Sequence, residues 1–132
     1  MNKARQARGV LARRDGRRAE VLAALWLMAK GYRILGFRLR TPQGEIDLLA
    51  QRGSVLAVVE VKTRPTLAEA LEAVGVDQRI RLRRAGAQLA AGRRGLASAQ
   101  VRLDLVAVVP SRWPRHLPDA WREDAQTAWG SV

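Results

Sequence analysis

The spacing of apolar residues in the first half of the chain predicts one helix followed by three strands. The helix covers residues 14–30; Asp15 or Gly16 can begin it, and Gly31 ends it because glycine is favoured just after a helix C-terminus. Turn-forming sequences then separate three stretches that alternate or are rich in β-branched residues: 32–40, 45–50 and 55–63. The pattern therefore predicts three consecutive antiparallel strands.

The second half of the chain predicts helices and then one more main strand. After Pro65, apolar residues repeat at helical spacing, and Asp77 is the expected N-cap of a helix with one apolar stripe: Leu82, Ala85 and Leu89. Residues 101–109 are almost continuously apolar, which is typical of a central strand buried on both faces. Residues 113–117 can add an edge strand, and residues 119–132 a short helix.

These elements predict an α/β fold in a single domain, with a central mixed β-sheet flanked by helices. The chain of 132 residues is long enough for one domain but not for two. We divide it into a basic N-terminal arm (1–12), a folded domain (13–122) and a C-terminal tail (123–132). The longest apolar run, residues 21–29, is too short to span a bilayer, which takes about 20 residues. We therefore expect a cytoplasmic protein without a membrane partner.

The charge of the chain changes this picture, because it points to a partner. The net charge is +12, and basic residues cluster in two blocks. A neutralising polyanion would relieve the resulting self-repulsion, although such runs also occur as solvated surface or reflect an arginine-rich genome. Charge alone does not separate DNA from RNA. We favour nucleic acid as the partner, with these residues as its contacts: Arg13, Arg14, Arg17, Arg79, Arg83 and Arg84.

Acidic residues converge on the second and third predicted strands. Side chains alternate between the two faces of a strand, so Glu45 shares a face with Asp47, and Glu60 shares a face with Lys62. A hairpin of these strands brings Asp47 near Glu60. Two neighbouring carboxylates repel each other, so a proton, a basic side chain or a cation must neutralise them. Mg²⁺ is usually held by one or two carboxylates together with substrate phosphate.

Such a site has the groups needed to hydrolyse a phosphodiester. The ion would polarise the phosphate and lower the pKa of a bound water, and Lys62 could stabilise the developing charge. Among the 24 basic residues only three are lysines, so a lysine here suggests a need for its compact, readily shifted charge. The alternative is a set of ordinary cross-strand pairs on a solvated face, each worth ~0.2–1 kcal/mol.

Several segments, in this order, resemble the YraN family of small bacterial proteins. The matching positions are Glu20, 31–35, 44–50, 59–64 and 102–106. The family is assigned to the PD-(D/E)xK nuclease superfamily, with Holliday-junction resolvases as structural relatives. The resemblance implies a restriction-endonuclease-like αβββαβ core, Mg²⁺ or Mn²⁺ as cofactor and DNA in preference to RNA as substrate. It is also compatible with a homodimer.

The resemblance also implies roles for single residues. Asp47 and Glu60 would be metal ligands, with the main-chain carbonyl of Val61 as a third, and Lys62 would be the catalytic lysine. Resolvase-like proteins also use a glutamate in the first helix, which here would be Glu20. Without the resemblance, Glu20 would be interpreted as an acid favoured by the dipole at the start of a helix.

One position departs from the family pattern. Family members commonly carry a lysine where this chain has Gln78, and Arg81 follows it. We assign Gln78, Arg81 and Glu45 supporting or substrate-handling roles. Two hypotheses remain: a divalent-metal-dependent endonuclease acting on DNA, including branched DNA, or a non-catalytic nucleic-acid-binding protein with the same fold. The two carboxylates and the lysine together favour the first, because binding alone would need only the arginines.

Overall fold

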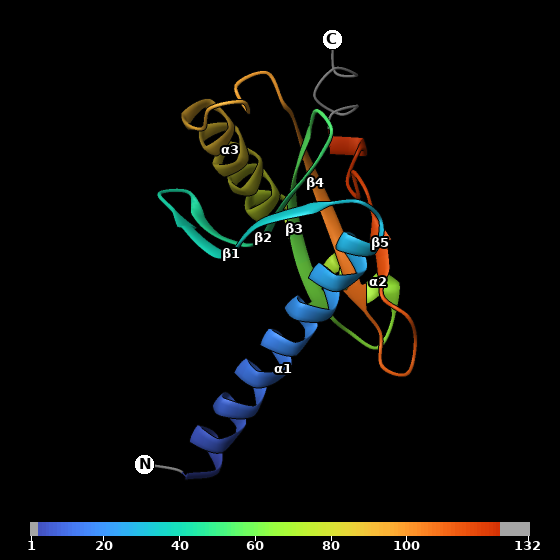
Figure 1. The fold of residues 1–132 in the computed structure, drawn as a ribbon. Coiled ribbons are helices and arrows are strands. Elements are labelled where there is room, and N and C mark those ends of the chain that lie inside the picture. Colours follow the sequence, from blue (N-terminus) through green and yellow to red (C-terminus); the bar gives the residue numbers. More distant parts are fainter. Residues whose placement is uncertain (1–2, 125–132) are drawn as a thin grey trace.

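A computed structural model describes the backbone of residues 3–124 and the side chains of residues 16–124 (Figure 1). Its elements are, in order, α1 (Lys3–Ala29), β1 (Arg33–Thr41), β2 (Gly44–Arg52), β3 (Val55–Thr63), α2 (Leu67–Glu72), α3 (Val76–Gly92), β4 (Gln100–Val108) and β5 (Arg115–Leu117). The strands form one sheet in the order β1-β2-β3-β4-β5. Strands β3 and β4 run parallel, and the other neighbours run antiparallel. The predicted α/β class with a mixed sheet is confirmed, and the arrangement is consistent with a restriction-endonuclease-like core.

Two helix starts differ from the prediction. Helix α1 begins at Lys3, so a start at Asp15 or Gly16 was wrong; the preceding stretch is rich in alanine and arginine, which favour helix. Helix α3 has Gly75 as its N-cap, and Asp77 lies in the first turn, where its charge suits the helix dipole. The expected tail helix falls mainly outside the described residues, and the division into arm, domain and tail stays a prediction.

Two separate apolar cores hold the helices against the sheet. Residues on one sheet face pack under α2 and α3, and their buried members include Leu49, Leu56, Val58, Leu82 and Leu103. Residues on the opposite face pack under α1, and their buried members include Ala23, Leu27, Leu48, Val59 and Val106. Because side chains alternate along a strand, consecutive residues of β2 and β3 enter different cores. Helices therefore cover both faces of the sheet (Figure 1).

Gly86 allows α3 to lie close to the sheet. A Cβ at this position would come within 2.6 Å of Val58 Cγ2 and 2.7 Å of Val101 Cγ1, closer than real Cβ atoms approach. Both neighbours are β-branched, so their rotamers are restricted and they cannot easily turn away. This glycine therefore sets the spacing between α3 and β3, the strand that carries Glu60 and Lys62.

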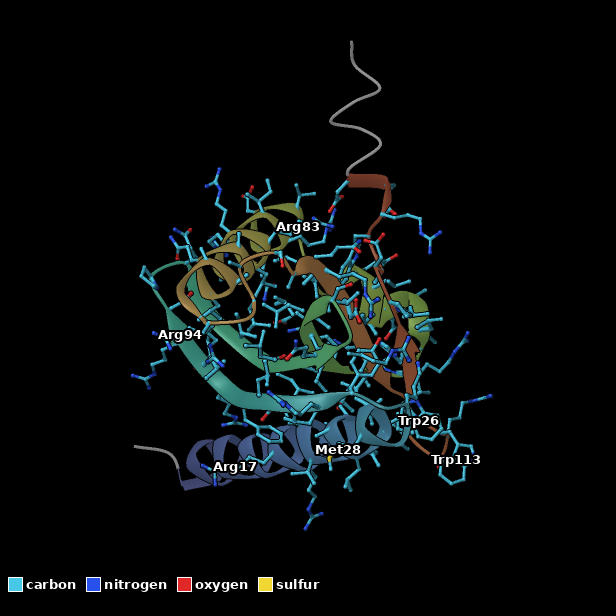
Figure 2. The ribbon with its side chains drawn as sticks, turned by 45° about the horizontal axis from the view of Figure 1, so that its top comes forward. Arg17, Trp26, Met28, Arg83, Arg94 and Trp113 are labelled. Carbon is cyan, nitrogen blue, oxygen red and sulfur yellow. The ribbon has the colours of Figure 1, made fainter. Side chains whose placement is uncertain are left out.

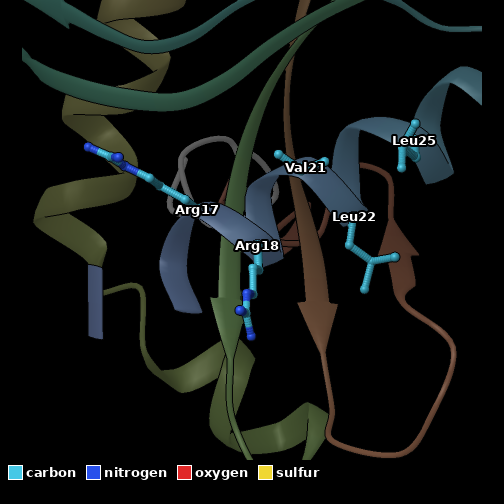
Figure 3. A pocket seen from close by; sticks show the side chains of 5 residues that line it. All are labelled: Arg17, Arg18, Val21, Leu22 and Leu25. Atoms are coloured by element: carbon cyan, nitrogen blue, oxygen red, sulfur yellow. The ribbon is translucent and has the colours of Figure 1, made fainter. Parts of the chain in front are cut away.

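Helix α1 packs on the sheet through small residues and turns larger ones outward. Its buried face consists of Ala19, Ala23, Ala24 and Leu27. Its exposed apolar residues are Val21, Leu22, Leu25 and Met28, and Met28 points away from the sheet in Figure 2. Three of them line an open pocket of about 390 Å³ with Arg17 and Arg18 (Figure 3). At the C-terminal end of α1, Trp26 stacks on Trp113 with ring centroids 5.8 Å apart. None of the helices in the described part of the chain is long and apolar enough to span a membrane.

Candidate active site

Asp47 lies where the ladders of the sheet are interrupted. The register of β2 with β3 ends at the pair Leu48–Val59, which places Asp47 opposite Glu60. Asp47 also has no partner in the pairing of β1 with β2, which goes from Phe37–Leu48 directly to Leu39–Ile46. Instead of continuing the ladder, the Asp47 Oδ2 atom accepts a hydrogen bond of 2.9 Å from the main-chain N–H of Val61. The structure thus brings Asp47 and Glu60 to the same row of the sheet.

Glu60 is the most deeply buried acid of this cluster, with 2% of the residue exposed. Its Oε2 atom lies 3.8 Å from Lys62 Nζ and accepts a 3.4 Å hydrogen bond from Gln78 Nε2. Its Oε1 atom has no hydrogen-bond partner among the described residues. Buried polar atoms in folded proteins are usually paired, so an open carboxylate oxygen at this depth calls for an explanation.

The electrostatics of the two carboxylates show the same deficit of positive charge. Burial, followed by the negative charge of Asp47, raises the pKa of Glu60 to about 8, although Lys62 acts to lower it. Burial also raises the pKa of Asp47, against the lowering effects of the Val61 N–H and of Lys62. A pair of this kind gains from sharing a proton or from a cation.

This donor set fits a hard divalent cation, which prefers carboxylate oxygens. In the described residues no group of three or more His, Cys, Asp or Glu side chains is arranged to hold a metal ion. An ion at Asp47 and Glu60 would therefore complete its shell with main-chain, water or substrate oxygens. Val61 meets this cluster through its N–H, and the role of its carbonyl as a metal ligand stays a prediction.

Glu20 reaches the cluster from α1, and Arg38 on β1 holds it there. Arg38 Nε lies 2.8 Å from Glu20 Oε2 and 3.2 Å from Oε1. The charge of Glu20 contributes to the raised pKa values of both Asp47 and Glu60, so the helix glutamate belongs to the same electrostatic site. Arg38 has a φ of +49°, which is uncommon for a residue other than glycine. Sequence reasoning missed Arg38, because strand alternation carries no signal for a left-handed residue.

The predicted supporting residues gather at the start of α3. Glu45, Gln78 and Arg81 line one small pocket of about 100 Å³ between β2 and α3. Gln78 faces the site through its contact with Glu60, and the charge of Glu45 acts on Asp47. Gln78 and Glu45 therefore act on the carboxylates, Arg81 lines the same pocket, and a role of the three in substrate handling stays a prediction.

The arginines predicted to contact nucleic acid differ in whether an acidic residue of the chain already binds them. Arg79 and Arg83 both bind Asp124, at 2.8 Å and 2.6 Å, so their charges are partly neutralised within the chain. Arg17 and Arg84 are exposed. Two more lie in the part of α1 whose side chains fall outside the described residues: Arg13 and Arg14. Contact of these arginines with nucleic acid stays a prediction.

A second buried carboxylate, Asp104 on β4, is surrounded by donors. Oδ1 accepts hydrogen bonds from Arg102 Nε at 2.7 Å and from the main-chain N–H of Asp119 at 3.0 Å. Oδ2 lies 2.8 Å from Arg102 Nη2 and 2.8 Å from His116 Nε2. Burial acts to raise the pKa of Asp104, but the hydrogen bonds from Arg102 and His116 outweigh it and lower the pKa.

His116 joins this carboxylate to the end of α1. Lys30 Nζ donates to His116 Nδ1, which leaves the Nε2–H to donate to Asp104. Arg102 also donates to the hydroxyl of Tyr32. His116 is thus a buried structural residue between two partners. Sequence reasoning placed it only at an edge strand, because its partners come from distant segments.

Known sequences agree with the motif order along the chain. Residues 19–108 match the sequence model of a family described as "Uncharacterised protein family UPF0102". A UPF0102 protein of Caulobacter vibrioides (strain NA1000 / CB15N) is 72% identical over 117 residues, covering 89% of this chain and 94% of that protein. A UPF0102 protein of Parvibaculum lavamentivorans is 52% identical over 120 residues, covering 91% of this chain and 90% of that protein. The chain belongs to the UPF0102 (YraN) family.

Proposed function

We propose that this protein is a divalent-metal-dependent endonuclease that hydrolyses phosphodiester bonds in DNA, including branched DNA. One observation carries the proposal: the buried Glu60 has an oxygen without a partner among the described residues, beside a second carboxylate that raises its pKa. A carboxylate with only a structural role would be expected to have its partners. The family's place in the PD-(D/E)xK superfamily supports DNA as the substrate.

The side chains of the site have separable roles in this proposal. Asp47 and Glu60 would hold Mg²⁺ or Mn²⁺, which would polarise a phosphate and lower the pKa of a bound water. Lys62 places an ammonium group 3.8 Å from Glu60, where it can stabilise negative charge that develops on the phosphate. Glu20, held by Arg38, is a further carboxylate available to orient a water.

A non-catalytic nucleic-acid-binding protein is the second candidate. Gln78 favours it, because a neutral amide 3.4 Å from Glu60 stands where the resemblance implies a lysine. Under either candidate the partner is nucleic acid. A homodimer would bring two active sites to one branched substrate, and light scattering with junction DNA measures whether two copies assemble.

The test measures cleavage and metal binding separately. Linear, flapped and four-way-junction DNA, and RNA, are incubated with the protein in Mg²⁺, Mn²⁺ or EDTA. We expect metal-dependent cleavage of DNA that falls roughly 100-fold or more in Asp47→Asn and Lys62→Gln. Electron paramagnetic resonance of Mn²⁺ should show weaker metal binding in Asp47→Asn but little change in Lys62→Gln.

Glu72→Gln is the matched control, because it removes an exposed carboxylate from α2. It should cleave like the wild type. If the wild type binds Mn²⁺ and DNA but cleaves no substrate, the second candidate stands. If Asp47→Asn and the wild type cleave equally, the activity belongs to another site or to a contaminant, and the catalytic proposal fails.

A further inference from the structure

Three arginines surround a pocket at the end of α3 that is remote from Gln78. The pocket has a volume of about 300 Å³ and is lined by residues from β1, from β2 and from the loop after α3. Its polar side chains are those of Arg33, Gln51, Arg93 and Arg94. Arg94 lies beside the strands β1 and β2 in Figure 2. We call it the arginine pocket.

These three arginines lack counter-charges, as do other exposed arginines such as Arg84 and Arg112, but they line one pocket together. Arg38, Arg79 and Arg102 are each held by a carboxylate. Among the described side chains, none makes an ion pair or hydrogen bond with the three arginines of the pocket, and no acidic residue lines it. The sequence also has no acidic residue between Asp77 and Asp104.

Attraction to the C-terminal end of α3 does not account for the cluster. Basic residues are favoured near helix C-termini, which would suffice for Arg93 and Arg94. Arg33, however, begins β1 and converges on the same pocket from another element. Three like charges around one hollow repel each other, and an anion would relieve that repulsion.

We propose that the arginine pocket binds a phosphate of a nucleic-acid backbone, outside the carboxylate site. The planar guanidinium fork matches the geometry of phosphate oxygens and can bind them bidentately. Contacts of this kind position a nucleic acid without reading its bases. The ligand is therefore a phosphodiester of any sequence.

The position of the pocket suggests how a substrate would lie. Helix α3 has 17 residues and is therefore about 25 Å long, with Gln78 in its first turn and Arg93 directly after its last. A strand of B-DNA carries one phosphate per about 3.4 Å of axis, so roughly seven phosphates span this length. That the strand held here is the one cut at Asp47 and Glu60 rests on the proposed function; binding of the phosphodiester does not.

The test compares two triple variants that remove the same charge. One is Arg33→Gln with Arg93→Gln and Arg94→Gln. The control is Arg112→Gln with Arg115→Gln and Arg122→Gln, three exposed arginines near or on β5, at the opposite edge of the sheet. Fluorescence anisotropy measures the Kd for duplex and junction DNA across a salt series, in EDTA so that no cleavage occurs. We expect the slope of log Kd against log salt to fall by about 1 in the pocket variant, equally for all DNA sequences, and by clearly less in the control.

Equal changes in the two triple variants would overturn the proposal. So would a pocket variant that loses affinity for inorganic phosphate, measured by calorimetry, but keeps the wild-type DNA slope. If the triple variant does not fold, the same binding measurement is made with the single variants Arg33→Gln and Arg33→Lys. Arg33→Gln should weaken DNA binding, and Arg33→Lys should recover part of the loss because it keeps the charge without the fork.

Failure of this proposal can be told from failure of the proposed nuclease. Suppose that the wild type cleaves no substrate, but the slope of log Kd against log salt falls in the pocket variant and not in the control. The arginine pocket is then supported, and the catalytic function is not. If the wild type cleaves DNA and the pocket variant binds DNA like the control, the nuclease stands and the arginine pocket falls.

Discussion

Two buried carboxylates on neighbouring strands have opposite surroundings. Asp104 accepts hydrogen bonds on both oxygens, from Arg102, His116 and the N–H of Asp119, and its pKa is lowered. Glu60 has one oxygen without a hydrogen-bond partner among the described residues, an ammonium group 3.8 Å from the other oxygen, and a raised pKa. Both residues are almost fully buried, so depth alone does not explain the difference.

The difference separates an acid that stabilises the fold from one that is available for another ligand. The donors around Asp104 connect β4 to β5 and to the end of α1, so their loss would disturb the fold. The surroundings of Glu60 leave a need for a proton or a cation, which a substrate complex can supply. An unpartnered oxygen thus distinguishes the two acids, whereas burial does not.

The largest expected effect is on stability when Asp104 is changed. Asp104→Asn should lower the free energy of unfolding by about 3–5 kcal/mol, because it leaves the largely buried charge of Arg102 without its counter-ion. Glu60→Gln should change it by roughly 1 kcal/mol or less in either direction, because the amide replaces a carboxyl that is largely protonated at pH 7. Urea unfolding of both variants at pH 7 measures the contrast, and equal losses would remove the distinction between the two acids.

The second largest expected effect is a difference between Glu60 and Asp104 in how their contributions to stability depend on pH. The pKa of Glu60 is about 8 in the folded protein, above its ordinary value of 4.5, so the folded state binds the extra proton between these values. Stability from this group is therefore lost as pH rises through that window. Asp104 has a lowered pKa, so its contribution is lost only as pH falls below the ordinary value of 3.8.

Urea unfolding of the wild type and of Glu60→Gln from pH 5 to pH 8.5 checks this. The wild type should lose stability relative to the variant as pH rises. Excess Mg²⁺ should reduce that loss, because an ion bound to the folded state replaces the proton. Parallel pH curves for the two proteins would show that the open oxygen of Glu60 carries no proton in this range.

Gly86 offers an intermediate effect, because it controls how closely α3 approaches the open carboxylate. Gly86→Ala should cost about 1–3 kcal/mol of stability through overpacking against Val58 and Val101. Gly92→Ala is the control in the same helix, since a Cβ there meets nothing within 4 Å, and it should be neutral or slightly stabilising. Thermal unfolding measures both variants, and equal melting temperatures would mean that α3 shifts without cost.

The smallest expected change in stability belongs to Lys62. Lys62→Gln should alter the free energy of unfolding by under ~1 kcal/mol, because the side chain is 22% exposed and its contact with Glu60 is 3.8 Å long. Arg102→Gln, which removes the cation of the other acid, should cost several times more. Chemical denaturation of the two variants measures the ratio of their losses in the free energy of unfolding. A large loss in Lys62→Gln would show that this lysine stabilises the fold.

Most of the fold follows from local pattern. The alternation along β2 and β3 and the turns between them predict the hairpin that sets Asp47 opposite Glu60. The start of α1 does not follow, because Asp15 and Gly16 resemble an N-cap although the helix continues to Lys3. Capping preferences are too weak to stop a helix when good helix formers lie on both sides.

The parts of the site that sequence could not supply are those made by tertiary contacts. Arg38 binds Glu20 across two elements and has a positive φ, which no side-chain period encodes. Arg79 forms an ion pair with Asp124, which is far away in the sequence. The block of basic residues around Arg79 therefore could not show that the charge of this arginine is partly neutralised. The sequence pattern identifies which residues share a face of a strand or helix. The tertiary contacts determine which of their charged side chains have an ion-pair partner.

The separation of the two cores has a consequence for motion. Asp47 and Glu60 lie on β2 and β3, which contribute to both cores, whereas Glu20 lies on α1, which packs on one face of the sheet mainly through alanines. Small side chains interlock little, so α1 is a natural unit of local opening. Hydrogen exchange should then release the α1 amides before those of β3. Each opening would withdraw Glu20 from the cluster while Asp47 and Glu60 stay together.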